Sequence, residues 1–351
     1  MRGAGTRVIA MRRGVRATGA LASLALAAFA LAGCGGVAMP VPTPGYTSTY
    51  LTPPPTTLTP LTGEVIAAGT PLGPSLAAKI DDHVDARPQV GLEHTDLVFE
   101  ELVEGGLTRY VAVWQSDVPA EIGPIRSIRP MDPDIIAPLG GIVAYSGGQQ
   151  RFVQAMKDTG VYNAIHGQAD TEDVMFRTDT KRAPHNVIVR APELIAKHAE
   201  LAPPAQQFAF APDAAGSTAM REGSPIATIA LRFSDSTKPS WTFDPTSGRY
   251  LRFQAGVADL DTVGAQLSAA NVIVIRVPIG NDGGVPKTEL IGSGEAWISS
   301  GGSSVHATWS KGSRTSLIRL VDDVGTVIRL ATGNSWIELV PQRGDAQFIA
   351  P

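Results

Sequence analysis

Short apolar runs separated by glycine- and proline-rich turns recur along the chain from about residue 75. Up to residue 203, runs of strand length alternate with two stretches whose apolar positions have helical spacing. Alternation of strands and helices predicts an α/β domain, which we place at residues 75–205. The expected strands are 76–80, 97–103, 109–114, 142–145 and 186–190, and the expected helices are 149–157 and 192–201.

The pattern changes after Pro203 and Pro204, where only short strands and turn signals follow. Regular strand and turn spacing predicts a mainly antiparallel β domain over residues 222–345, a sandwich or an open barrel. The fold class is therefore α+β overall. Tryptophan faces can stack on sugars, but single tryptophans on separate strands favour a packed core, and we expect a core role for Trp241, Trp297, Trp309 and Trp336.

The first 34 residues have the layout of a bacterial lipoprotein signal. Five arginines and no acidic residue precede an apolar run at 21–31, which is too short to span a bilayer. Leu31-Ala32-Gly33-Cys34 then matches a lipobox, in which the cysteine is diacylated after cleavage. We predict a signal peptide at 1–33 and an acyl anchor at Cys34 that holds the protein on the outer face of the plasma membrane. The alternative is an ordinary secretory signal with Cys34 as a free thiol.

Residues 34–74 join this anchor to the predicted domains. The segment is rich in proline and threonine and almost uncharged, so we expect a semi-rigid stalk that forms no core.

Charge and cysteine content narrow the classes of partner. The formal net charge is −4, and loss of the five signal arginines leaves 24 basic against 33 acidic residues, or −9. Such an acidic chain has no electrostatic footprint for nucleic acid, so we expect no nucleic-acid partner. A single cysteine excludes a disulfide framework and metal clusters of the cysteine type.

Two acidic side chains follow the apolar run at 97–103. On a continuous strand, Glu100 and Glu104 would point to the same face, because side chains alternate with period 2. Paired carboxylates beside Arg109 suit a general acid/base pair or a cation site. The alternative is an exposed face neutralised by Arg109.

Two further groups of polar residues have binding or catalytic chemistry. In Gly123–Arg129, a Gly-Pro turn presents Arg126, Ser127 and Arg129, which can grip a carboxylate or phosphate, or else form structural ion pairs. Arg182, His185 and Asn186 lie where a strand begins, and His185 could act as a base or be a structural histidine.

Residues 81–85, Asp-Asp-His-Val-Asp, carry side chains that can ligate a divalent cation. Their spacing matches no calcium loop or zinc signature, so the sequence assigns no metal and no cofactor.

Several ordered motifs resemble the YerB-like lipoprotein family of bacteria, which is built from two consecutive domains of unknown function. The resemblance covers nearly the whole chain after the stalk and implies an envelope lipoprotein, but it transfers no catalytic residue. Asp82 departs from the family pattern, in which asparagine is expected. The motifs are residues 79–83, 86–92, 96–100, 104–109, 122–127 and 182–186 in the first domain, and 292–296, 308–311 and 333–337 in the second.

Two hypotheses of function follow. In the first, the N-terminal domain binds an anionic or polar envelope component, such as a wall polymer or a partner protein. In the second, the protein hydrolyses an envelope glycan or phosphodiester, with Glu100 or Glu104 as acid/base and with His185 and arginines stabilising negative charge. The candidate ligand-binding residues are Asp81, Arg87, Arg109, Arg126, Ser127, Arg129, Arg182 and Asn186, with His185 beside them.

Overall fold

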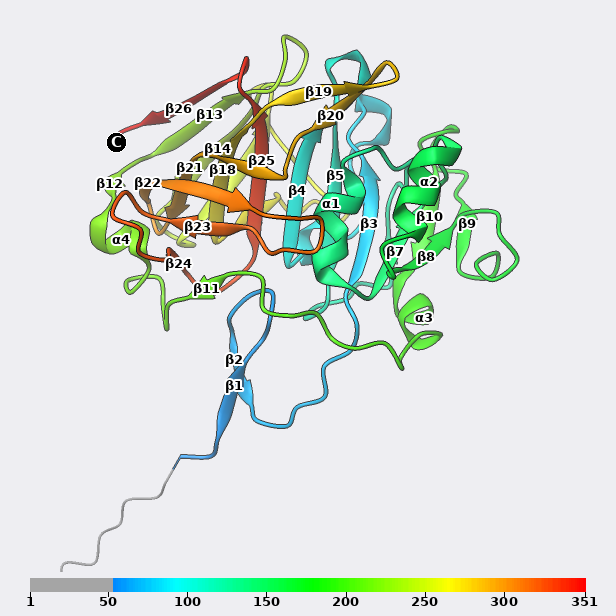
Figure 1. Ribbon diagram of the computed structural model, residues 1–351, viewed down its shortest axis with the longest axis horizontal. Coiled ribbons are helices and arrows are strands. Elements are labelled where there is room, and N and C mark those ends of the chain that lie inside the picture. The colour runs from blue at the N-terminus through cyan, green and yellow to red at the C-terminus, as the bar shows by residue number, and fades with distance from the viewer. Residues whose placement is uncertain (1–52) are drawn as a thin grey trace, which may run out of the picture. The chain divides into compact units, whose positions relative to one another are not determined.

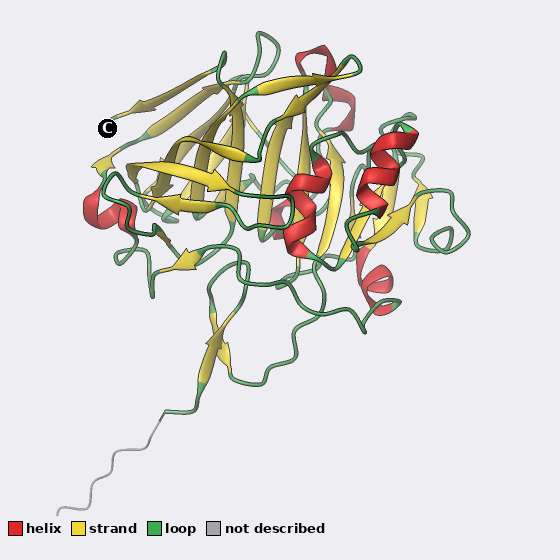
Figure 2. Ribbon diagram, viewed as in Figure 1, coloured by secondary structure: helices red, strands yellow, loops and turns green. Residues whose placement is uncertain are grey.

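The computed structural model describes residues 53–351, which form one compact unit. Strands make up most of this unit, and its helices are short (Figure 2). The predicted signal peptide and the lipidation site Cys34 lie outside the described residues. Among the residues described, no helix combines the length and apolarity needed to cross a bilayer.

The centre of the unit is an eleven-stranded mixed sheet. Ten of its strands follow the order β12-β22-β21-β18-β25-β4-β5-β3-β7-β8, and β23 pairs with β22. The strands are β3 (Leu76–Asp81), β4 (Leu97–Leu102), β5 (Thr108–Trp114), β7 (Ile142–Tyr145), β8 (Tyr162–Ile165), β12 (Ser224–Pro225), β18 (Asn271–Val277), β21 (Gly292–Ser300), β22 (Ser303–Lys311), β23 (Arg319–Val321) and β25 (Ser335–Pro341).

This sheet is continuous across the two predicted domains. β25 pairs in parallel with β4, with Ser335–Glu338 opposite Leu97–Glu100. The N-terminal segment and the C-terminal segment therefore share one sheet (Figure 1).

A second, six-stranded sheet has the order β16-β15-β14-β13-β26, with β17 paired to β15. Its buried Trp241 and Tyr250 belong to the same hydrophobic core as Trp336 and Val274 of the large sheet, so the two sheets pack face to face. The strands are β13 (Thr228–Arg232), β14 (Pro239–Asp244), β15 (Arg249–Gln254), β16 (Val257–Ala258), β17 (Ser268–Ala269) and β26 (Asp345–Ile349).

Besides a two-stranded hairpin near the N-terminal end of the described residues, three smaller sheets complete the strand pairing. They are β6-β10-β9, β11-β24 and β19-β20. Their strands are β6 (Glu121–Ile122), β9 (Met175–Arg177), β10 (Val187–Arg190), β11 (Ala209–Phe210), β19 (Ile279–Asp282), β20 (Val285–Thr288) and β24 (Arg329–Leu330).

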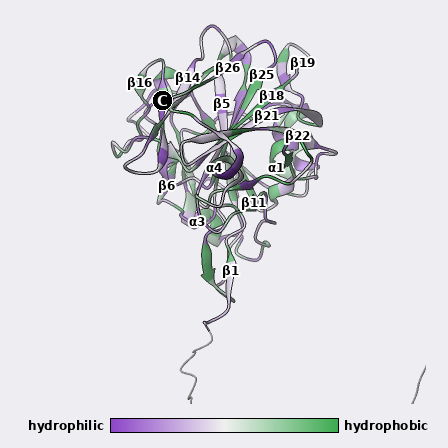
Figure 3. Ribbon diagram, turned by 90° about the vertical axis from the view of Figure 1, so that its left-hand side faces the viewer, coloured by the Kyte–Doolittle hydropathy of each residue, from purple (hydrophilic) through white to green (hydrophobic). Residues whose placement is uncertain are grey.

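The opposite face of the large sheet carries a second hydrophobic core. Helices α1 and α2 lie across this face and bury Ile136, Phe152 and Met156 in that core (Figure 1). Strands enclosed on both faces are mainly hydrophobic, as the green colour of β18 and β25 shows in Figure 3, and β25 in addition buries Glu338. The α-helices are α1 (Asp132–Ile136), α2 (Gln150–Lys157), α3 (Ala191–Ala196) and α4 (Thr218–Glu222), and the 3₁₀ turns are η1 (Val84–Ala86), η2 (Leu92–His94), η3 (Glu104–Gly106) and η4 (Ala137–Leu139).

The structure confirms the predicted fold class: a mixed sheet with helices, followed by antiparallel strands. Trp241, Trp309 and Trp336 are fully buried, as a core role requires, and Trp297 is partly buried against Phe348. The predicted helix at 192–201 is shorter, since α3 ends at Ala196.

Part of the proline- and threonine-rich segment is folded. β1 (Thr56–Leu58) pairs with β2 (Val65–Ala67), and Leu61 in the connecting turn is completely buried. We expected no core contribution before residue 75. The core residue there is Leu61, a single leucine at the tip of a hairpin. Because one isolated apolar residue produces no apolar periodicity, the sequence pattern does not predict its burial.

Candidate functional site

The candidate site lies where β3 ends and β5 begins. Asp81, the last residue of β3, is paired with Arg109 of β5, and paired residues on adjacent antiparallel strands point to the same face. Around them is a hollow of about 100 Å³. It is lined by Asp81, His83, Val103, Glu104, Leu107, Thr108, Arg109, Arg126, Arg129 and His185.

Asp81 connects two of the basic side chains of this hollow. Its Oδ2 atom lies 2.5 Å from Nδ1 of His185 and 2.9 Å from Nε of Arg126. A carboxylate accepts hydrogen bonds, so Nδ1 of His185 carries a proton, and the neutral imidazole in this tautomer has its lone pair on Nε2. Asp81 is buried, and it therefore orients the imidazole at the edge of the hollow.

Three guanidinium groups converge on the same space. Nη1 of Arg109 donates to the backbone oxygen of Ser127 at 2.7 Å, and Nε of Arg129 donates to Oε2 of Glu104 at 2.7 Å. Burial and the positive charges of Arg129 and Arg126 lower the pKa of Arg109 to about 10. The site therefore carries excess positive charge that an anion would relieve.

Glu104 is held as a carboxylate. Burial acts to raise its pKa, but the hydrogen bond from Arg129 and the nearby positive charges bring the pKa below its ordinary value. A group that loses its proton this readily is a poor general acid near neutral pH.

Glu100 does not reach the hollow. The strand β4 ends at Leu102, so the alternation assumed for Glu100 and Glu104 does not extend to Glu104, which lies in the turn η3. Glu100 is paired with Tyr110, on the sheet face opposite Arg109, and it is completely buried. Nη2 of Arg252 donates to its carboxylate at 2.7 Å.

Four other candidate residues also lie outside the lining: Arg87, Ser127, Arg182 and Asn186. Ser127 contacts the site through its backbone oxygen, which accepts from Arg109. Arg87 donates to Asp82 at 2.7 Å, and Thr108 holds the other oxygen of Asp82 at 2.7 Å. Arg182 is exposed. Asn186 is buried and accepts from Nη1 of Arg177 at 2.7 Å.

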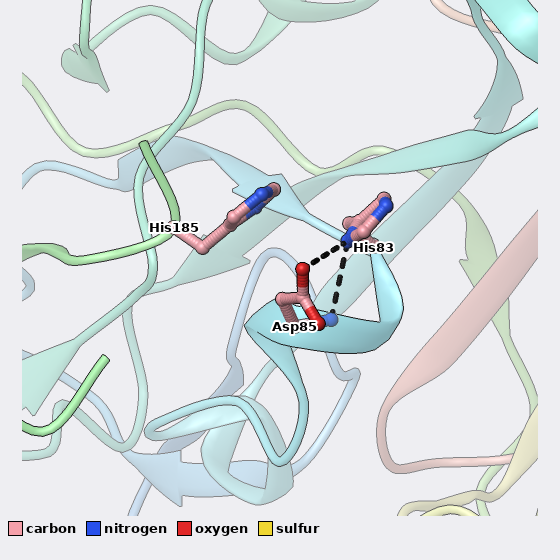
Figure 4. A group of neighbouring side chains, drawn as sticks. All are labelled: His83, Asp85 and His185. Atoms are coloured by element: carbon pink, nitrogen blue, oxygen red, sulfur yellow. Dashed lines mark hydrogen bonds and ion pairs between the residues drawn. The ribbon is translucent and has the colours of Figure 1, made fainter. Parts of the chain in front are cut away.

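His83 lines the hollow, although the sequence analysis named it only within the motif at 81–85, whose side chains can ligate a divalent cation. Its ring stacks on that of His185, with centroids 4.6 Å apart and planes inclined by 18°, and Asp85 lies close beside it (Figure 4). The motif at 81–85 was the available signal, but its partner His185 comes 100 residues later.

Larger hollows elsewhere lack this convergence. One of about 360 Å³ is lined by four acidic side chains against one arginine, Arg249. Another, of about 300 Å³, is lined mainly by apolar atoms around Val257 and Leu260. The first contains a carboxylate-bound histidine, His94 with Asp117 at 2.6 Å, but a single arginine, and the second contains one arginine and no histidine.

Comparison with known proteins agrees with this architecture. Residues 61–203 match the family model described as a protein of unknown function (DUF3048), N-terminal domain, and residues 229–337 match its C-terminal domain. The chain thus has the paired-domain organisation of a family whose function is not known. It belongs to the DUF3048 family.

One relative and one solved structure document the similarity. A Bacillus subtilis (strain 168) protein named "Putative lipoprotein YerB" is 31% identical over 111 residues, which is 32% of this chain and 33% of that protein. The aligned region thus spans about a third of the relative's length. The crystal structure of YerB protein from Bacillus subtilis superposes with a TM-score of 0.71 at 21% identity, covering 83% of this chain and 99% of that one. At this identity the superposition establishes the fold.

Proposed function

We propose that this protein is a lipid-anchored, extracytoplasmic protein that binds one anionic group of an envelope component in the hollow around Arg109, Arg126, Arg129 and His185. The lipobox at Cys34 supports the anchor, as does the name of the Bacillus subtilis relative. The observation that carries the binding proposal is the convergence of three guanidinium groups and a carboxylate-oriented histidine on one hollow.

The size of the hollow limits what enters it. Pockets that enclose whole small molecules are typically ~300–1,000 Å³. A hollow of about 100 Å³ therefore suits a single phosphate or carboxylate group of a larger ligand. Forked, charge-assisted hydrogen bonds from arginines are the usual means of holding either group.

Cosedimentation with purified cell wall tests this proposal and distinguishes a phosphate group from a carboxylate group as the ligand. Binding to intact wall is compared with binding to wall from which acid has removed phosphate-bearing polymers. Loss of binding after acid assigns a phosphate, and retained binding assigns a carboxylate of the wall peptides. The double variant Arg126→Gln/Arg129→Gln is expected to bind neither preparation. Binding equal to that of the parent would refute the site.

A second candidate function, hydrolysis of a phosphodiester or a glycan, is favoured by the Asp81–His185 pair. An imidazole oriented by a buried carboxylate, with a free Nε2 beside arginines, is the arrangement of a general base next to groups that stabilise negative charge. In this form His185, rather than Glu100, transfers the proton. Release of soluble wall fragments by the parent, abolished in His185→Asn with binding retained, would establish it. No release would leave binding as the function.

A further inference from the structure

Three potential metal ligands meet at the edge of the arginine-lined hollow. His83 and Asp85 come from the turn around η1, and His185 comes from the loop before β10 (Figure 4). One ligand atom from each lies within 4.8 Å of the other two.

The spacing within the turn already approaches that of a metal site. Nδ1 of His83 lies 3.5 Å from Oδ2 of Asp85. Zinc–ligand distances of about 2.0–2.1 Å place tetrahedral ligands about 3.3 Å apart, so this pair needs little movement. Nδ1 of His83 now accepts from the backbone N–H of Asp85 at 3.1 Å, and an ion would take the place of that hydrogen bond.

His185 is prepared for the same ion by its second interaction. Because Asp81 binds the Nδ1 proton of His185, the lone pair is on Nε2. A carboxylate behind a ligating histidine is the usual outer-shell arrangement of metal sites, and it both fixes the tautomer and raises ligand basicity. Asp85 is well exposed, so its carboxylate can close the remaining gap.

We propose that His83, Asp85 and His185 bind a divalent transition-metal ion, of which zinc is the type case, with Asp81 as the outer-shell partner of His185. Two imidazoles and one carboxylate suit zinc better than calcium or magnesium, which prefer oxygen ligands. Three protein ligands leave a fourth position for water or a bound group. This proposal goes beyond anion binding and does not depend on it.

Isothermal titration with zinc chloride in a non-chelating buffer tests the site. The full chain in detergent, stripped with chelator, is used in a Cys34→Ser background, so that no unacylated Cys34 thiol can bind zinc. His83→Ala and His185→Ala each remove one ligand, and Asp81→Asn removes the outer-shell carboxylate. His166→Ala is the matched control, because within residues 53–351 the side chain of His166 makes no hydrogen bond or ion pair and only its backbone N–H is bonded.

The parent and His166→Ala are expected to bind one zinc ion per chain with equal affinity. His83→Ala and His185→Ala are expected to weaken binding at least about tenfold, and Asp81→Asn by about 10–100-fold. Near-ultraviolet circular dichroism identifies any variant that has lost its fold. If the other variants are unfolded, His83→Ala alone decides between metal binding and its absence, because His83 is a partly exposed turn residue whose loss leaves the fold intact. No stoichiometric binding by the parent, or equal binding by His83→Ala and His166→Ala, would overturn the proposal.

The two proposals fail separately. Binding of phosphate and of acetate is measured on the same chelator-treated protein without zinc. Zinc binding with neither anion bound leaves the metal site and removes the anion site. Binding of either anion without zinc binding removes the metal site.

Discussion

Replacing Arg252 with methionine is expected to destabilise the protein strongly. Arg252, in β15 of the six-stranded sheet, is completely buried. It donates to Glu100 at 2.7 Å, to Asp259 at 2.9 Å and to Glu338 at 3.1 Å. Since Glu100 is in β4 and Glu338 in β25, one side chain connects the second sheet to the strand pair that joins the two halves of the chain.

The expected magnitude follows from these contacts. Removing one partner of a buried ion pair costs ~3–5 kcal/mol, because the other charge stays buried without compensation. The guanidinium also lies 4.7 Å from the ring centroid of Trp336, a cation–π contact of ~0.5–2 kcal/mol. Arg252→Met should therefore lower the free energy of unfolding by about 5 kcal/mol, comparable with the whole stability of a modest domain at ~5–15 kcal/mol.

Urea unfolding of the full chain measures this loss, with Glu100→Gln as the matched control. Glutamine keeps the shape of Glu100 and an oxygen that can accept from Arg252, and the guanidinium retains its two other carboxylate partners, Asp259 and Glu338. We expect Glu100→Gln to cost less than about 1 kcal/mol and to retain anion binding. A free energy of unfolding for Arg252→Met within about 1 kcal/mol of the parent's would refute the reasoning. A loss of stability in Glu100→Gln as large as that in Arg252→Met would also refute it.

Two further predictions concern the pH dependence of stability and the close packing around Gly123. Burial raises the pKa of Asp96 to about 6, although hydrogen bonds from Ser116 act to lower it. The native state therefore binds this proton more tightly than the unfolded chain, whose aspartates titrate near ~3.9, and stability falls as the pH rises from about 4 to 6. Asp96→Asn should gain up to about 3 kcal/mol over the parent at pH 7 and almost nothing at pH 4 in urea unfolding, and an equal difference at both would contradict this. A Cβ atom at Gly123 would lie 2.8 Å from the first carbonyl oxygen of β10. Gly123→Ala should thus displace the turn that carries Arg126 and weaken binding of phosphate or acetate, whichever the parent binds, about tenfold in calorimetry. Gly73→Ala, where a Cβ atom meets nothing within 4 Å, should bind that anion as the parent does. Equal affinities of the two variants would refute the link.

Much of the fold was predictable because buried strands leave a local signal. The apolar runs at 76–80, 97–103 and 142–145 became β3, β4 and β7 within one residue at each end. The pairing of β4 with β25 joins segments more than 200 residues apart, and no local pattern specifies which strand adjoins which.

The sequence indicated which types of residue the site contains, but not which of the candidate residues lie together. Arg126, Arg129 and His185 carry chemistry that can be recognised in the sequence, and all three line the hollow. Glu100 and Glu104 were placed on one face on the assumption that the strand continues through Glu104, but β4 ends at Leu102 and Glu104 lies in the turn η3. Glu100 pairs with Tyr110, so it points to the face opposite Arg109. The contact between Asp81 and His185 depends on tertiary structure, which periodicity does not encode.

The most direct test of the anion-binding proposal is calorimetric titration of the full chain with inorganic phosphate and, separately, with acetate. Arg126→Gln removes one guanidinium of the hollow, and Arg151→Gln, at an exposed arginine paired with Asp282, is the control. The account predicts that the parent and Arg151→Gln bind at least one of these anions equally, and that Arg126→Gln binds it about tenfold more weakly or worse. Binding of neither anion by the parent, or equal binding by Arg126→Gln, would contradict it.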